Sequence, residues 1–304
     1  MTRRGSNPSR RSPVGLAALL SVLGSLPGCG SDPTSSGGSG TEKFTTWGED
    51  YIENQIPADP AGQSGFLDGW TLHYDKFLVG FHEIRVADEN GHVGARSPDS
   101  YLVDNTKPGR KTLVTFPHLD AKAWTAVSYQ IKPVVADAKV VSGDPEDLAM
   151  MVDAGYSIYV EGNAKKEGTT KTFHWGFTTA TQYEDCHHEE EGKDTLGVVV
   201  TNGSSDTSEL TTHGDHFFYD RLQASPDPAI KTSLRFDEKA AADDKPNGDG
   251  DGDITVAEMS KLPIDVTKYD PSGLRAPTIG AFVTALARTI GHFRGEGECT
   301  ISEL

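Results

Sequence analysis

The chain has 304 residues, enough for one large domain or two small ones. Asp and Glu number 45 against 28 Lys and Arg, which gives a formal charge of -17 at pH 7. Because this charge repels phosphate groups, it disfavours nucleic-acid binding and electrostatic attachment to anionic lipids. The 12 Phe, 9 Tyr and 4 Trp residues can build a packed core, which argues against wholesale disorder.

Residues 1–28 predict a signal peptide. A basic stretch precedes an apolar run at residues 14–26, and these 13 residues are too few to span a bilayer as a helix, which takes about 20. Residues 26–29, Leu-Pro-Gly-Cys, resemble the lipobox of bacterial lipoproteins. The resemblance implies that Cys29 is acylated and that Gly30 directs the protein to the outer membrane. An ordinary signal peptide with an incidental cysteine is the alternative.

Residues 29–43 are rich in Gly and Ser and predict a linker that holds a domain away from a membrane surface. The expected partners are therefore a membrane, through the lipid on Cys29, and an unidentified protein or envelope component. We expect no nucleic-acid partner. The sequence does not distinguish a periplasmic from a surface orientation.

The cysteines predict an exported protein. With Cys29 lipidated, Cys186 and Cys299 remain as an even pair in an oxidising compartment. We expect a disulfide that ties the C-terminal tail to the body, and the alternative is two free thiols.

Residues 44–212 predict an antiparallel β-sandwich. Residues 70–86 are rich in aromatic and β-branched side chains and end at a turn signal. Within residues 124–131, Val127, Tyr129 and Ile131 fall on one face and polar residues on the other. Short strands separated by Gly, Pro and Asp clusters are typical of this fold. Further strand candidates are residues 111–116, 124–132, 156–161, 171–177 and 197–201.

Helical patterns are the main feature of the C-terminal third. Residues 144–154 predict a short helix inside the body, and residues 213–304 predict an α-helical region. Within that region we expect helices at residues 214–222, 234–244 and 278–293, the last with a regular apolar face. The predicted fold class is thus α+β, an antiparallel β-sandwich followed by an α-helical C-terminal region.

Residues 247–258, Asn-Gly-Asp-Gly-Asp-Gly-Asp-Ile-Thr-Val-Ala-Glu, resemble the twelve-residue loop of EF-hand proteins. Calcium takes six to eight oxygen ligands, which this spacing of side chains can supply. Gly252 allows the sharp turn, Ile254 packs inward, and residues 255–258 form a capping box for the exiting helix. The implied calcium ligands are Asn247, Asp249, Asp251, the Asp253 carbonyl, Thr255 and Glu258.

The loop departs from that pattern at two positions, and the first departure predicts weaker calcium binding. Asn247 replaces the usual Asp and removes a charge, and Pro246 forces the entering helix to stop near Asp244. One such loop is present, which favours a structural ion over a sensor. The alternative is an acidic surface loop that binds nothing.

Histidine clusters are the other candidate metal ligands. They comprise His187 and His188 in an acidic segment, and His213 and His216 with Asp215 between them. Imidazole with carboxylate suits zinc or copper. Gly214 makes a helix through the second pair doubtful, so the two imidazoles need not share one face. The alternative is an exposed acidic turn and histidines that cap backbone groups.

The strand patterns at residues 101–104, 127–131 and 156–162 resemble the periplasmic copper-binding sandwich proteins associated with methanobactin operons. The resemblance spans about 120 residues and carries no metal ligand over to this chain. It implies a β-sandwich that handles a transition metal in the periplasm.

The sequence carries no nucleophile elbow, phosphate-binding glycine loop, His-Glu-x-x-His motif or dinucleotide fingerprint. We therefore expect a non-catalytic, envelope-anchored calcium-binding lipoprotein with a binding or scaffolding role. The first alternative is a copper- or zinc-binding protein that uses the histidine clusters. The second is a divergent hydrolase, for which His213, Asp215 and His216 are the first residues to test.

Overall fold

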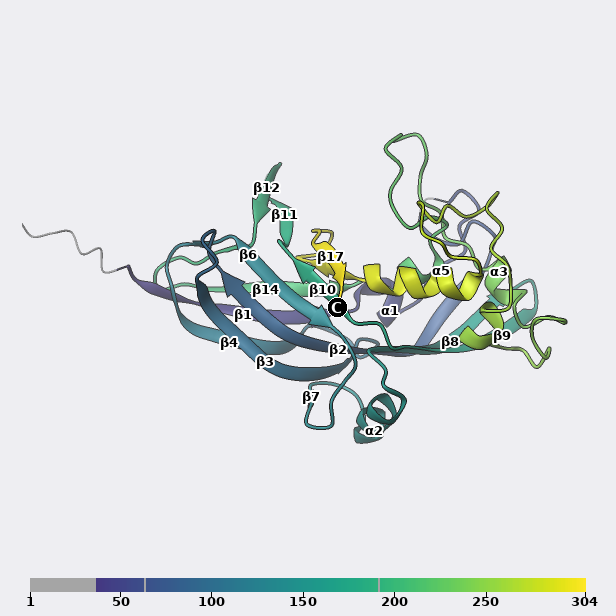
Figure 1. Cartoon of the computed structure of the whole chain (residues 1–304), viewed down its shortest axis with the longest axis horizontal. Coiled ribbons are helices and arrows are strands. Elements are labelled where there is room, and N and C mark those ends of the chain that lie inside the picture. The colour runs from purple at the N-terminus through teal and green to yellow at the C-terminus, as the bar shows by residue number, and fades with distance from the viewer. Residues whose placement is uncertain (1–36, 63, 191) are drawn as a thin grey trace, which may run out of the picture. The chain divides into compact units, whose positions relative to one another are not determined.

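The computed structural model describes residues 37–62, 64–190 and 192–304 (Figure 1). Cys29, the predicted lipobox and the predicted signal peptide lie outside these residues. Within the described part of the chain, no helix combines the length and apolar character that a membrane span requires.

Strand β2 (Thr71–Ala87) organises the larger, nine-stranded sheet. It pairs antiparallel with β3 (Val93–Asp104), β6 (Ala126–Ile131) and β8 (Ile158–Lys166). Most residues of β2 are buried, and many of them are aromatic or β-branched, as expected for a central strand. The remaining strands of this sheet are β7 (Lys139–Val140), β9 (Thr169–Phe177), β10 (Thr181–Glu184), β15 (Asp253–Thr255) and β17 (Thr300–Glu303).

A second sheet has the order β16-β14-β1-β4, and the two sheets form a sandwich-like arrangement (Figure 1). One hydrophobic cluster contains residues of both sheets, including Phe44 and Phe81. The expectation of purely antiparallel pairing was wrong, because β1 runs parallel to β14 from Thr41 opposite Ser205 onward. The strands of this sheet are β1 (Ser39–Trp47), β4 (Lys111–Asp120), β14 (Ser205–Thr212) and β16 (Gly291–Phe293).

The linker predicted at residues 29–43 overlaps strand β1, and its residues 29–36 lie outside the described residues. Residues from Ser39 onward belong to β1, between β14 and β4. Gly40 serves close packing there, because a Cβ at this position would lie 2.6 Å from the Thr201 carbonyl oxygen. The glycines in this stretch suggested a linker, but Gly40 instead allows close packing within a strand.

Most of the predicted strands are confirmed. Strands β2, β4, β6, β8 and β9 fall where periodicity placed them, and the buried face of β6 carries Val127, Tyr129 and Ile131. The predicted strand at residues 197–201 is reduced to β13 (Val198–Val199), which pairs with β5 (Ala123–Trp124). The remaining short pair is β11 (His187–Glu190) and β12 (Lys193–Leu196).

Helix α2 (Pro145–Ala154) is confirmed at the predicted place, with a capping box formed by Asp144 and Asp147. The last helix was predicted too long. Helix α5 (Ile279–Leu286) is followed by the 3₁₀ turn η2 (Ala287–Thr289) and then by β16.

Close packing explains why α5 stops. A Cβ at Gly291 would lie 2.6 Å from the Tyr129 hydroxyl oxygen, so the chain passes there as a tightly packed strand. The apolar pattern beyond Leu286 thus reflects burial in the sheet and not a continued helix.

The other helices expected after residue 213 are also short. The predicted helix at residues 214–222 is the 3₁₀ turn η1 (His216–Phe218), and that at residues 234–244 is α3 (Asp237–Ala240). Consecutive Phe217 and Phe218 are both fully buried, which a one-sided helix does not allow. The other helices are α1 (Glu49–Glu53) and α4 (Val256–Met259).

The predicted disulfide between Cys186 and Cys299 is present and buried. It joins the segment after β10 to the segment before β17. The main-chain N–H of His187 donates to the Glu298 carbonyl 2.9 Å away, so the two segments are also hydrogen-bonded.

Candidate metal centre

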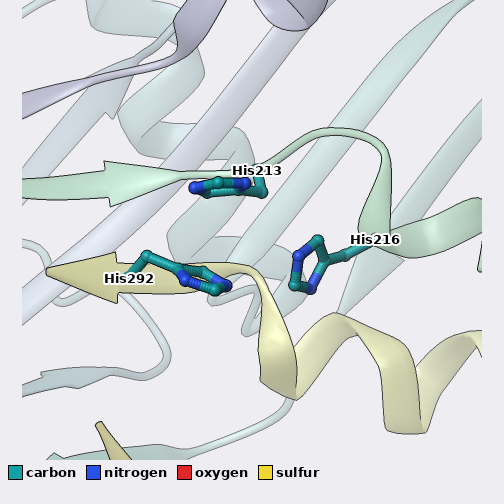
Figure 2. A group of neighbouring side chains, drawn as sticks. All are labelled: His213, His216 and His292. Carbon is teal, nitrogen blue, oxygen red and sulfur yellow. The ribbon is translucent and has the colours of Figure 1, made fainter. Parts of the chain in front are cut away.

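Three histidines from two distant segments converge at one end of the smaller sheet (Figure 2). His213 directly follows β14, His216 begins η1, and His292 lies in β16. Because β16 pairs antiparallel with β14, His292 lies opposite Thr211. One ring nitrogen from each histidine lies within 4.8 Å of the others. The ring centroids are 4.1 Å apart for His213 and His292, 5.0 Å for His216 and His292, and 5.3 Å for His213 and His216.

Gly214 allows the tight turn that positions the side chains of His213 and His216. A Cβ at this position would lie 2.6 Å from Ile52 Cγ1, so only glycine lets the turn pack there. The Tyr74 hydroxyl donates to the Gly214 carbonyl 2.5 Å away. The segment is a tight turn instead of a helix, and this turn brings the His213 and His216 rings together.

Burial keeps the imidazoles neutral. The exposed fractions of His213, His216 and His292 are 4%, 8% and 6%. Burial lowers the pKa of all three rings, and for His213 and His216 the neighbouring His292 lowers it further. Neutral imidazole is the form that binds a metal ion, so all three rings are in the ligating state at neutral pH.

Hydrogen bonds fix the tautomers of two rings. The Thr289 hydroxyl donates to the Leu286 carbonyl at 2.9 Å, so its oxygen accepts from His216 Nδ1 at 2.8 Å. The lone pair of His216 is then on Nε2. His213 Nε2 lies 3.3 Å from the Gly295 carbonyl oxygen, an acceptor only, which leaves the lone pair on Nδ1.

His292 Nδ1 is buried and has no hydrogen-bond partner among the described residues. An unpaired buried polar atom is costly unless something satisfies it. A metal ion held by the three rings would supply a partner at this position, so the residues fit a transition-metal ion.

Two carboxylates lie beside the histidines. His213 Nε2 is 3.5 Å from Glu49 Oε1, and ligand atoms of Glu49, His213 and Glu296 lie within 4.8 Å of one another. Burial and the negative charges of Glu296 and Asp215 raise the pKa of Glu49 to about 7. Glu49 thus lies beside the same ring nitrogen of His213 that donates to the Gly295 carbonyl.

His216 and His292 line a cavity of about 420 Å³. Tyr219, Arg221, Glu296 and Glu298 lie in the same wall. The histidine cluster is therefore buried but adjoins a space large enough for a small molecule.

No family model, curated protein or solved structure matches this chain. The chemistry of the site therefore rests on its own residues.

The sequence identified two members of the cluster, His213 and His216, and missed His292, Glu49 and Glu296. No local motif marks these three residues, and His292 lies in a segment with a helical pattern. Asp215, the other residue singled out, is partly buried and accepts a hydrogen bond from the Tyr219 hydroxyl at 3.1 Å.

The structure places His187 and His188 elsewhere. His187 Nδ1 lies 2.6 Å from Asp194 Oδ1 across the β11–β12 pair, and the His188 ring packs edge-on against Phe293. Neither belongs to a group of three or more converging His, Cys, Asp or Glu ligands among the described residues.

The predicted calcium loop gathers part of its acidic residues. Ligand oxygens of Asp249 and Glu258 lie within 4.8 Å of one another and of Asp243, a residue that the sequence did not suggest. The predicted capping box is confirmed, since Thr255 Oγ1 accepts from the Glu258 N–H at 3.2 Å and Glu258 Oε2 accepts from the Thr255 N–H at 2.9 Å. Ile254 is fully buried, as predicted.

The other loop residues make local contacts. Asp249 Oδ1 and Asp251 Oδ1 accept from main-chain N–H groups two residues further on, at 3.1 and 2.8 Å. The Asp253 side chain faces β9, where its Oδ2 is 2.6 Å from His174 Nδ1. Asp243 accepts from the N–H groups of Gly250 and Gly252 and forms an ion pair with Lys171. Gly252 has a φ of 95°, in accord with the predicted sharp turn.

Proposed function

We propose that this chain is a transition-metal-binding protein that holds zinc or copper through His213, His216 and His292. The observation that carries the proposal is the convergence of three buried, neutral imidazoles within ligand distance of one another. Three imidazoles with an open fourth position are a ligand set found for zinc and copper in proteins.

Hydrogen bonds and close contacts to the ring nitrogens of His213 and His216 support the proposal. The Thr289 hydroxyl oxygen accepts from His216 Nδ1. Glu49 and the Gly295 carbonyl lie beside His213 Nε2. Such partners orient imidazoles so that the other nitrogen faces the metal.

We also propose that the protein is exported and anchored to the cell envelope. The lipobox-like residues before Cys29 favour this location, and the disulfide between Cys186 and Cys299 is consistent with an oxidising compartment. A structural calcium ion in the loop 247–258 is a second candidate, favoured by the proximity of Asp243, Asp249 and Glu258.

Competitive titration of the metal-free protein with Zn²⁺ and Cu²⁺, against an indicator of known affinity, tests the metal proposal. We expect one tightly bound ion per chain. His292→Ala should weaken binding at least about 100-fold, because two imidazoles hold zinc or copper far less tightly than three. His187→Ala is the matched control, and its affinity should equal that of the wild type. Equal affinity of His292→Ala and wild type would refute the proposal.

A further inference from the structure

We propose that the three-histidine centre activates a water molecule for hydrolysis of a small uncharged ester, with Glu296 as the general base and Arg221 facing the reacting carbonyl. This inference rests on the proposed metal site and adds an activity to it. It needs three elements in one place: an open metal position, a base, and a polar cavity for the substrate.

The open position follows from the ligand set. Three protein ligands leave the fourth position of a tetrahedral zinc ion to water, and zinc lowers the pKa of that water to about 7. Two of the three ligands, His216 and His292, line the cavity, whereas His213 is not among its lining residues. A water molecule on the metal would therefore face the cavity from the side of His216 and His292.

Glu296 is placed to act as the base. It lines the same cavity, and its carboxylate belongs to the group of ligand atoms that lie within 4.8 Å of one another around His213. Glu298 also lines the cavity but is not part of that group. Of these two cavity carboxylates, Glu296 is thus the one grouped with His213, one of the three proposed ligands.

Arg221 supplies a positive charge in the cavity wall. Its side chain is largely buried and lies beside two carboxylates: Nε is 3.4 Å from Asp220 Oδ1, and Nη1 is 3.9 Å from Asp270 Oδ2. Because Arg221 lines the cavity, its terminal N–H groups can donate to the oxyanion that develops during acyl transfer.

The cavity also indicates the substrate class. Its volume of about 420 Å³ suits a small molecule. The wall carries the carboxylates of Glu296 and Glu298 together with the Arg221 guanidinium, so charges of both signs are present and no single substrate charge is matched throughout. An uncharged ester with a short acyl group meets both conditions.

The reaction balances without an oxidant or reductant. The metal-bound water gives a proton to the Glu296 carboxylate while its oxygen bonds to the ester carbonyl carbon. The carbonyl oxygen becomes an oxyanion beside Arg221. The carbon–oxygen bond to the alcohol then breaks, the leaving alkoxide takes the proton back from Glu296, and the products are a carboxylic acid and an alcohol.

The test compares zinc-loaded with chelator-stripped full-length protein, using 4-nitrophenyl acetate as the probe and measuring zinc content and affinity in parallel. We expect zinc-dependent turnover. In Glu296→Gln, turnover should fall at least about 100-fold with zinc affinity unchanged. Glu298→Gln, the control from the same wall, should keep the wild-type rate.

The outcomes separate the two proposals. One bound zinc ion per chain with a rate no higher than that of the stripped protein overturns the hydrolytic inference and leaves the metal site intact. Absence of zinc and copper binding overturns both. Full activity in Glu296→Gln, or loss of zinc from it, overturns the assignment of Glu296 as the base.

Discussion

The imidazole rings of His213 and His292 lie with their centroids 4.1 Å apart, although they come from segments far apart in the sequence. Their proximity follows from the antiparallel pairing of β14 and β16, which sets His292 opposite Thr211. The position of the candidate metal ligands is thus determined by the edge of the smaller sheet, and changes in that edge should be detectable in metal affinity.

Thr289 should contribute to metal affinity without touching the metal. Its hydroxyl oxygen accepts from His216 Nδ1 at 2.8 Å. We expect Thr289→Val to lower zinc affinity about 10-fold, because the ring loses its orienting partner. Thr284→Val in α5, whose hydroxyl donates to the Gly280 carbonyl, is the control. Competitive titration measures both variants, and equal affinities would contradict the orienting role of Thr289.

The disulfide should support both stability and the metal site. Cys299 closes the segment that carries His292 and Glu296, and it joins this segment to Cys186. Replacing both cysteines by Ser should lower the free energy of unfolding by about 2–5 kcal/mol. Because the segment loses a restraint, zinc affinity should fall as well. Denaturant unfolding and zinc titration test the two parts, and unchanged zinc affinity would separate the disulfide from the site.

The buried Glu42 in β1 should make stability depend on pH. Its side chain is fully buried, and burial raises its pKa from the ordinary value of 4.5 to about 7. Between these values the folded protein binds more protons than the unfolded chain, so this residue's contribution to stability decreases as the pH rises from 4.5 to 7.

Glu42→Gln should remove this loss. Relative to the wild type, it should gain on the order of 3 kcal/mol between pH 4.5 and pH 7, measured by urea unfolding. Glu184→Gln, at an exposed position on β10, is the control. Parallel stability curves for wild type and Glu42→Gln would show that Glu42 is not buried in the sheet.

Asp243 should matter for calcium if the loop binds it. Its carboxylate oxygens lie near those of Asp249 and Glu258. We expect millimolar calcium to raise the Tm of the wild type, with a Kd of about 10⁻⁴ to 10⁻³ M, and Asp243→Asn to lose most of that rise. Asp244→Asn, whose side chain is 70% exposed, is the neighbouring control. An equal calcium response in wild type and Asp243→Asn would rule Asp243 out as a ligand.

Local patterns predicted those parts of the fold that depend on one segment. Alternation identified the buried face of β6, and the spacing of Thr255 and Glu258 identified the capping box. In each case the deciding interactions lie within a few residues of one another or on one face of one strand.

Tertiary packing decided the rest. The segment around Gly291 follows a helical pattern but forms a strand, because it packs against Tyr129 and Tyr183. His292 lies in this segment, so the error in secondary structure concealed the third histidine. Gly40 was read as part of a linker although it packs in a strand. In both cases the residues that the glycine packs against lie far away in the sequence, so no local pattern identifies them.

X-ray absorption spectroscopy of the zinc-loaded protein tests the metal centre most directly, because it counts the imidazoles bound to the ion. The proposed site predicts three imidazoles and one further light-atom ligand at about 2.0–2.1 Å, with one imidazole fewer in His216→Ala. A spectrum without imidazole scattering, or one that His216→Ala leaves unchanged, would contradict it.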